Sequence, residues 1–240
     1  MALDVYVGSL TRYYLEDWET PIQRYCRETG KEFVRVRVNE QNNDSGDVIK
    51  DPEFVRSHVI AWREAINNGL SEIVSSPLDW DETSSSSYFA EQLRWENLSS
   101  LKLWAAYLEN PDLSRPTKCV EDWTTDEAFK RVDEPNDTKY PNLLRNVTAW
   151  IPADCKRVVF DTQEVNGNTT TFGTVIGLRS ELNEINELTW KADETTIAKW
   201  KRASTEQKAP LEEGARFGFA LLYTLATTAL EHKLVMRLDG

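Results

Sequence analysis

The chain has 240 residues, with 40 Asp and Glu against 28 Lys and Arg, which gives a formal net charge of −12. Hydrophobic residues make up 40% of the sequence, as in folded globular proteins, and this composition excludes a disordered chain. The excess of carboxylates disfavours nucleic acids and anionic membranes as partners, because both present phosphates, and it favours basic partners.

In the first half of the chain, hydrophobic spacing predicts two strands separated by a short helix, followed by two longer helices. In chain order these are a strand over 3–8, a helix over 21–30, a strand over 33–38, a helix over 51–69 and a helix over 95–108. The helix over 51–69 has the clearest start, because Asp51 is a good N-cap and Pro52 suits the first turn. Three polar or acidic segments are expected to be exposed loops: 13–19, 39–47 and 75–87.

The second half begins with an irregular stretch up to Pro141, in which a short helix is expected after Thr125. The elements predicted after it are strands over 147–151, 158–160 and 169–174, helices over 178–188, 193–203 and from Leu211 onward, and a strand over 234–238. The last helix is apolar on most sides and is expected to be central, with Gly214 and Gly218 marking close helix packing. The sequence therefore predicts one α+β domain over 1–240, with a small mixed or antiparallel sheet packed against amphipathic helices.

No standard catalytic signature is present. His58 and His232 have no recognisable Ser or Cys partner, and neither a nucleophile elbow nor a phosphate-binding glycine loop occurs. Glu181, Glu184 and Glu187 share a helix face without the histidines of a di-iron site, so a solvated face is expected. We therefore predict no catalytic residue, no metal site and no cofactor.

The location of the protein is predicted from its cysteines and its apolar stretches. Three widely spaced cysteines fit neither a disulfide framework nor a zinc site, so reduced thiols are expected. No signal peptide is recognisable, and threonines interrupt the longest apolar stretch, over 217–230. We expect a cytoplasmic protein that does not insert into membranes.

Three of the nine tryptophans are embedded in acidic residues within predicted loops. Protein interfaces concentrate binding energy in a few aromatic and Arg anchors, and surrounding carboxylates speed association with a positive partner. The candidate partner-binding residues are Asp79, Trp80, Asp81 and Glu82 first, Glu121, Asp122 and Trp123 second, and then Glu16, Asp17 and Trp18. Carboxylates beside tryptophan would also suit a glycoside hydrolase or a small-ligand-binding protein, and both alternatives stay open.

The beginning of the chain carries a resemblance to a known group of proteins. Residues 3–14 read LDVYVGSLTRYY and are followed by Asp17, Trp18 and Glu19. These residues, with segments 78–81 and 103–107, resemble uncharacterised bacterial proteins that are similar to immunity proteins of polymorphic toxin systems. The resemblance implies a cytoplasmic protein that binds and neutralises a cognate toxin by covering its active site or a basic surface. It supplies no functional residues that can be transferred to this chain.

Overall fold

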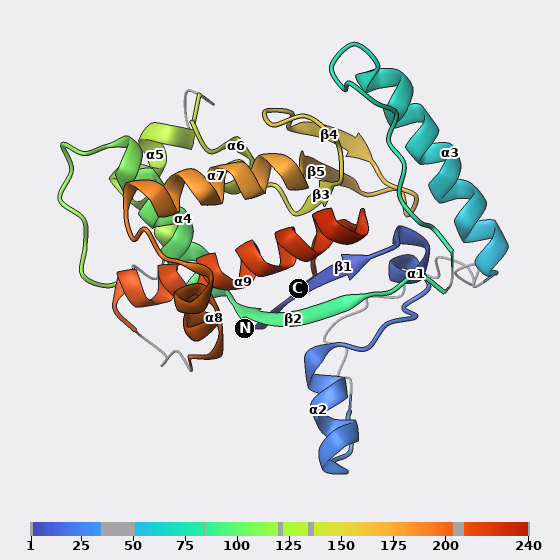
Figure 1. Cartoon of the computed structure of the whole chain (residues 1–240), viewed down its shortest axis with the longest axis horizontal. Coiled ribbons are helices and arrows are strands. Elements are labelled where there is room, and N and C mark those ends of the chain that lie inside the picture. The colour runs from blue at the N-terminus through green and yellow to red at the C-terminus, as the bar shows by residue number, and fades with distance from the viewer. Residues whose placement is uncertain are drawn as a thin grey trace.

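The computed structural model describes residues 2–34, 51–83, 85–119, 122–133, 137–203 and 209–239. Six strands form one mixed sheet in the order β2-β1-β6-β3-β5-β4 (Figure 1). The strands are β1 (Ala2–Gly8), β2 (Phe89–Arg94), β3 (Ala149–Ile151), β4 (Phe160–Gln163), β5 (Thr169–Thr174) and β6 (Val235–Asp239). Among the described strands, β3 and β5 pair in parallel, and the other neighbours are antiparallel.

Helices pack around this sheet and confirm the predicted α+β class. They are α1 (Leu10–Tyr14), α2 (Pro21–Thr29), α3 (Pro52–Leu70), α4 (Trp95–Glu109), α5 (Glu127–Asp133), α6 (Pro141–Leu144), α7 (Val175–Leu188), α8 (Glu194–Arg202) and α9 (Leu211–His232), with a short 3-10 helix η1 (Trp123–Thr125). Within the described ranges, each helix is too short or too polar to cross a lipid bilayer.

Most predicted elements are confirmed within a few residues. Strand β2 was not predicted, because Ala, Glu, Gln, Leu and Arg within it favour helix and only its pairing with β1 makes it a strand. The predicted loop over 13–19 begins inside α1. The loop over 39–47 and most of the strand over 33–38 lie outside the described residues, and Phe33 and Val34 are not in a strand.

The sheet has one apolar face and one polar patch on its other face. Leu3, Val5 and Val7 of β1 and Met236 and Leu238 of β6 belong to the large core that includes α4, α7 and α9. Because side chains alternate along a strand, Asp4, Tyr6, Arg237 and Asp239 point to the opposite face. A second core on that face joins α3 to residues of β3 and β5, including Val59, Ile151 and Phe172. The centre of the sheet therefore presents charged side chains on the face that α1 and α3 flank.

Close contact between α4 and α9 depends on two glycines. A Cβ atom at Gly218 would lie 2.6 Å from the carbonyl oxygen of Asn97, and one at Gly214 would lie 2.7 Å from the hydroxyl of Ser100. Both distances are too short for a side chain to fit without movement of α4. The expected helix packing and the central position of α9 are confirmed.

The predicted solvent face of α7 is correct for Glu184 and Glu187 but wrong for Glu181. The carboxylate of Glu181 is buried and accepts hydrogen bonds from the backbone N–H groups of Asn142 (2.9 Å) and Leu143 (3.0 Å). These donors lie in the first turn of α6, where backbone N–H groups lack partners within the helix. Burial raises the pKa of Glu181 to about 8, although the hydrogen bonds from Asn142 and Leu143 oppose the shift.

Candidate functional site

The segment 79–82 connects to the start of α1 through Glu82, and it is less accessible to a partner than its acidic sequence indicates. Trp80 is only 3% exposed, and its indole N–H donates to the carboxylate of Glu82 at 2.5 Å. Glu82 also accepts from the backbone N–H groups of Leu10 (3.0 Å) and Thr11 (2.7 Å) at the start of α1. The prediction of an exposed loop is therefore wrong for Trp80 and Glu82, whose partners are internal.

Asp79 and Asp81 are the two residues of that segment that remain exposed. Arg63 of α3 lies 3.7 Å from the carboxylate of Asp79, donates to the carbonyl of Trp80 at 2.6 Å and sits over the indole ring. The side chain of Asp81 accepts hydrogen bonds from Thr83. The negative charge of this segment is therefore partly balanced by α3.

The second predicted segment, 121–123, lies at the other end of the molecule. Glu121 is outside the described residues, and Asp122 is exposed. Trp123 is half-buried against Phe129 of α5, and the ammonium of Lys102 lies over its ring at 5.2 Å. Figure 1 shows α5 and α3 at opposite ends of the fold. The structure therefore places segment 79–82 and residues 122–123 at opposite ends of the fold.

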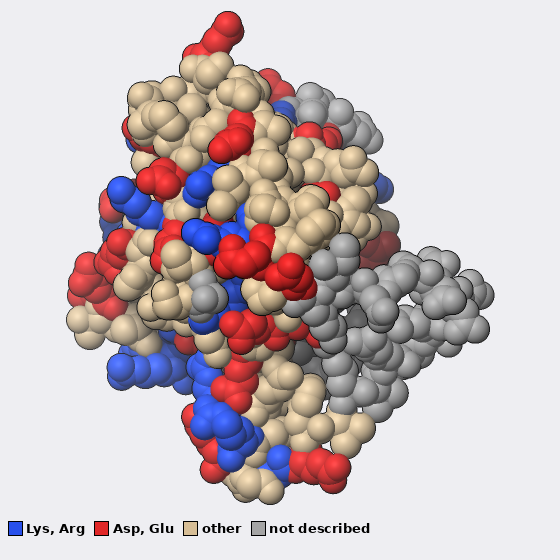
Figure 2. All heavy atoms as spheres, turned by 90° about the vertical axis from the view of Figure 1, so that its right-hand side faces the viewer, with Lys and Arg blue, Asp and Glu red and all other residues tan. Residues whose placement is uncertain are grey.

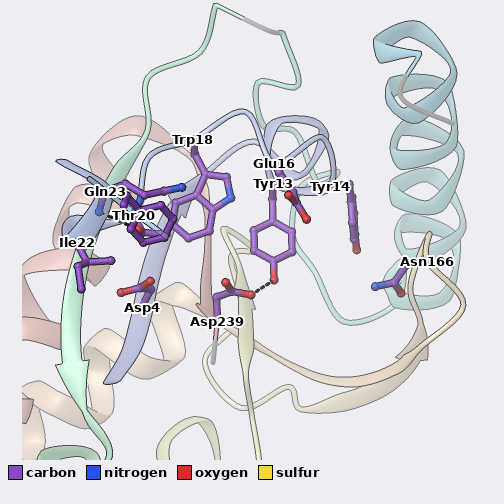
Figure 3. A pocket seen from close by; sticks show the side chains of 11 residues that line it. Asp4, Tyr13, Tyr14, Glu16, Trp18, Thr20, Ile22, Gln23, Asn166 and Asp239 are labelled. Atoms are coloured by element: carbon purple, nitrogen blue, oxygen red, sulfur yellow. Dashed lines mark hydrogen bonds between the residues drawn. The ribbon is translucent and has the colours of Figure 1, made fainter. Parts of the chain in front are cut away.

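The third predicted segment, 16–18, lines a pocket. Glu16 and Trp18 both contribute to its wall, whereas Asp17 is exposed and lies 3.4 Å from Arg12. The pocket has a volume of about 440 Å³ and is formed by the polar patch of β1 and β6, by α1, and by residues at the start of α2 (Figure 3). Its lining residues are Asp4, Tyr13, Tyr14, Glu16, Trp18, Thr20, Ile22, Gln23, Phe33, Asn166 and Asp239.

Two carboxylates lie next to one another in this pocket. Asp4 of β1 and Asp239 of β6 face each other in the antiparallel register, so both side chains project from the same face of the sheet. Figure 3 shows them close together, with Trp18 and Tyr13 nearby. Burial raises the pKa of Asp4, the negative charge of Asp239 raises it further, and a hydrogen bond from Gln92 of β2 opposes both effects. Asp4 therefore keeps its proton to a higher pH than an ordinary aspartate.

Aromatic rings form much of the remaining wall. The rings of Tyr13 and Trp18 are nearly parallel, with centroids 6.1 Å apart and an angle of 19° between their planes. Tyr13 donates a hydrogen bond to Asp239 at 2.5 Å, which fixes both groups. The ring of Tyr6 packs against the indole of Trp18, with the ring centroids 4.9 Å apart. The pocket wall is therefore held in place by contacts among its own residues.

A buried ion pair supports the pocket from the side of the β4–β5 hairpin. Glu164, whose side chain is 0% exposed, accepts from Arg237 at 2.7 Å and from the hydroxyl of Tyr14 at 2.6 Å. The guanidinium of Arg237 also lies 4.4 Å from the centre of the Tyr13 ring. Because Arg237 is already paired with Glu164, its charge is not fully available to neutralise the carboxylates of the pocket.

The described lining of the pocket is acidic and aromatic. Among its described lining residues there are three carboxylates and four aromatic rings, and no lysine or arginine. Figure 2, which views the molecule from the right-hand side of Figure 1, shows acidic and basic side chains intermingled over that face. A net charge of −12 does not produce a uniformly acidic face there.

Comparison of the chain with protein-family models, with curated proteins and with solved structures gave no match. In the part of the chain that the structure describes, no three His, Cys, Asp or Glu side chains converge closely enough to hold a metal ion. His58 and His232 are both exposed, and neither lines the pocket.

Sequence reasoning found Glu16 and Trp18 but missed Asp4, Tyr13 and Asp239. One signal was present in the alternation of residues 3–7, which places Asp4 on the polar side of a half-buried strand. The pairing of β1 with β6, which brings Asp239 beside Asp4, depends on the tertiary fold and has no local signature. The pocket could not be assembled from sequence spacing for this reason.

Proposed function

We propose that the protein acts by stoichiometric binding to a basic protein partner, as an immunity protein that neutralises a cognate toxin. The supporting observation is the pocket, whose described lining carries three carboxylates and four aromatic rings without a basic residue. A cationic side chain of the partner would enter it and meet Asp4, Asp239 and the indole of Trp18. The volume of about 440 Å³ lies within the range of about 300–1,000 Å³ that is usual for ligand pockets.

The physical basis of this binding is the combination of aromatic rings and carboxylates. A cation over an aromatic ring is attracted by the negative face of the ring, and a desolvated site strengthens this attraction. One basic side chain in a pocket is a typical interface anchor, while the surrounding contacts exclude water. The acidic excess of the whole chain would speed encounter with a positively charged toxin. Neutralisation then follows if the rest of the interface covers the active site of the toxin.

The proposal is tested by capturing the partner with matched baits. The pocket variant is Asp4→Asn with Asp239→Asn, and the control is Asp112→Asn with Glu127→Gln, which removes the same charge from exposed positions outside the pocket. Each bait is incubated with native lysate, and bound proteins are identified by mass spectrometry. We expect one basic protein to bind the wild type and the control but not the pocket variant.

The captured protein is then expressed alone, together with the wild-type 240-residue protein, and together with the pocket variant. Growth arrest by the partner alone, and rescue by the wild type but not by the pocket variant, is the expected result. A third variant, Asp79→Asn with Asp81→Asn, measures whether the exposed acidic segment contributes to capture. Failure to enrich any basic protein, or a partner that leaves growth unaffected, would refute the immunity function.

A glycoside hydrolase is the second candidate, and the register of the two aspartates favours it. Residues directly opposite in an antiparallel pair have Cβ atoms about 4.5–5.5 Å apart. The two carboxyl groups of retaining glycosidases are about 5–5.5 Å apart, and one of them must hold a proton. Asp4 with its raised pKa would be the acid, Asp239 the nucleophile and Trp18 the platform for the sugar. Release of nitrophenol from a panel of nitrophenyl glycosides, abolished by Asp4→Asn, would establish this activity in place of the binding function.

A further inference from the structure

Resting on the proposed function, we propose that the pocket selects a guanidinium group, the head of an arginine side chain, over an ammonium group. We further propose that its entry displaces a proton from Asp4 to the solvent.

Selection of guanidinium follows from the shape of the wall. A guanidinium is planar and stacks on flat rings, whereas an ammonium is a compact and more strongly hydrated point charge. The rings of Tyr13 and Trp18 lie nearly parallel at 19°, so they offer flat surfaces of similar orientation. The same cluster already holds one guanidinium, because that of Arg237 lies 4.4 Å from the centre of the Tyr13 ring.

The two aspartates strengthen this selection. A guanidinium directs five N–H donors in one plane and can reach two acceptors at once. Asp4 and Asp239 face each other across adjacent strands, and the hydroxyl of Tyr13 already holds one oxygen of Asp239 in place. The acceptors are therefore positioned for a forked donor.

Displacement of a proton follows from the crowding of negative charge. Oδ1 of Asp4 is buried without a hydrogen-bond partner, and the facing Asp239 disfavours a second negative charge. Among the described residues, the other ionisable groups that line the pocket are Tyr13 and Tyr14 of α1 and Glu16 of the following loop. Arg237 of β6 lies over the Tyr13 ring and is paired with Glu164.

The exchange of charge is balanced. The O–H bond of the Asp4 carboxyl group breaks, its proton passes to the buffer, and the guanidinium enters with its own protons retained. Protons and the guanidinium thus compete for one site. Affinity therefore falls as the pH is lowered, with a limit of tenfold per pH unit below the pKa of Asp4.

The test uses small probes on the purified protein: propylguanidinium, propylammonium and the neutral propylurea. Isothermal titration calorimetry is carried out between pH 4.5 and pH 7 in two buffers with different enthalpies of ionisation, which reports proton release directly. We expect propylguanidinium to bind at least tenfold more tightly than propylammonium, propylurea to show no binding, and proton release to increase as the pH falls.

Two variants keep the test independent of folding. Asp4→Asn should retain the fold, as judged by near-ultraviolet circular dichroism, and bind propylguanidinium with no pH dependence and no proton release. Asp112→Asn, at an exposed position outside the pocket, should behave as the wild type. Equal affinity for the two cations, or unchanged proton release in a folded Asp4→Asn variant, would overturn the inference.

The outcomes for the probes and for the partner are separable. Binding of propylguanidinium without capture of a toxin would support the pocket chemistry and refute the immunity function. Conversely, the wild-type protein could capture a toxin and yet bind propylguanidinium and propylammonium equally well. That result would support the immunity function and refute the selection of guanidinium. In the captured partner, replacement of the anchoring arginine by lysine should weaken the complex at least tenfold.

Discussion

Replacement of Glu164 by Gln is expected to destabilise the protein by about 3 kcal/mol, because it leaves the charge of Arg237 buried without a counter-ion. The side chain of Glu164 is 0% exposed and that of Arg237 is 12% exposed, so water cannot readily replace the lost carboxylate. Removal of one partner from a buried ion pair costs about 3–5 kcal/mol in general. The low end applies here, since Gln still offers an acceptor and the ring of Tyr13 still contacts the guanidinium.

The assay is equilibrium unfolding in urea at pH 7, with Glu127→Gln as the matched control. Glu127 pairs with Arg131 on the exposed surface at 3.1 Å, so its replacement should change the free energy of unfolding by less than about 1 kcal/mol. For a chain of this length, the Glu164→Gln variant should also lose roughly 6–12 °C in Tm. A loss below about 1 kcal/mol in Glu164→Gln would refute the reasoning that this pair holds the pocket wall.

The same pair gives a pH dependence of known sign. Burial acts to raise the pKa of Glu164, but hydrogen bonds from Arg237, Thr170 and Tyr14 outweigh it and hold the pKa below its ordinary value. A carboxyl group whose pKa is lowered by folding stabilises the fold above its ordinary pKa, and this contribution is lost as the pH falls through the lowered value. The stability difference between the wild type and Glu164→Gln should therefore shrink on acidification.

Three further predictions concern the core. Gly218→Ala should lower the free energy of unfolding by about 2 kcal/mol, because the new Cβ atom would lie 2.6 Å from the carbonyl oxygen of Asn97. Gly69→Ala on α3, where no atom lies within 4 Å of the new Cβ atom, should raise it by about 0.5–1 kcal/mol. Urea unfolding measures both variants, and equal effects would contradict the packing argument. Burial raises the pKa of Glu181 to about 8, so the folded state keeps this proton to a higher pH than the unfolded state does. The free energy of unfolding should therefore fall between pH 4.5 and pH 8, by at most about 1.4 kcal/mol per pH unit. Glu181→Gln should remove this slope when unfolding is measured across the same pH range. Burial lowers the pKa of Lys102 to about 8, because the charged ammonium is destabilised away from water. Lys102→Met should therefore raise Tm at pH 7, and the gain in Tm should shrink toward pH 10. A lower Tm of the variant at pH 7 would show that the contact of Lys102 with Trp123 outweighs the cost of desolvation.

The fold could be predicted from the sequence where local signals agreed. Asp51 and Pro52 mark the beginning of α3, and Gly30 ends α2 in a left-handed conformation, as their sequence positions predict. Strand β2 shows the opposite case, because its helix-forming residues become a strand only by pairing with β1. Local propensity competes with tertiary pairing, and the pairing has no signature within a short window.

The candidate site shows the same division between local and tertiary information. Trp18 was found because an aromatic ring beside carboxylates is visible in the sequence, and it lines the pocket. Trp80 has the same neighbours but is buried, because Glu82 turns inward to bind the beginning of α1. Whether an acidic residue faces solvent or caps a distant helix depends on contacts that sequence spacing does not contain. Glu181 was misplaced for the same reason.

The floor of the pocket joins strands that are separated by nearly the whole 240-residue chain, since Asp4 lies on β1 and Asp239 on β6. Closing a loop of this length costs about 5 kcal/mol in chain entropy if nothing else has folded. The pairing of β1 with β6 is therefore expected late in folding, after helix packing has shortened the effective loop. During synthesis on the ribosome, Asp239 cannot take its place beside Asp4 until β6 has emerged. A nascent chain that lacks β6 therefore lacks the floor of the pocket.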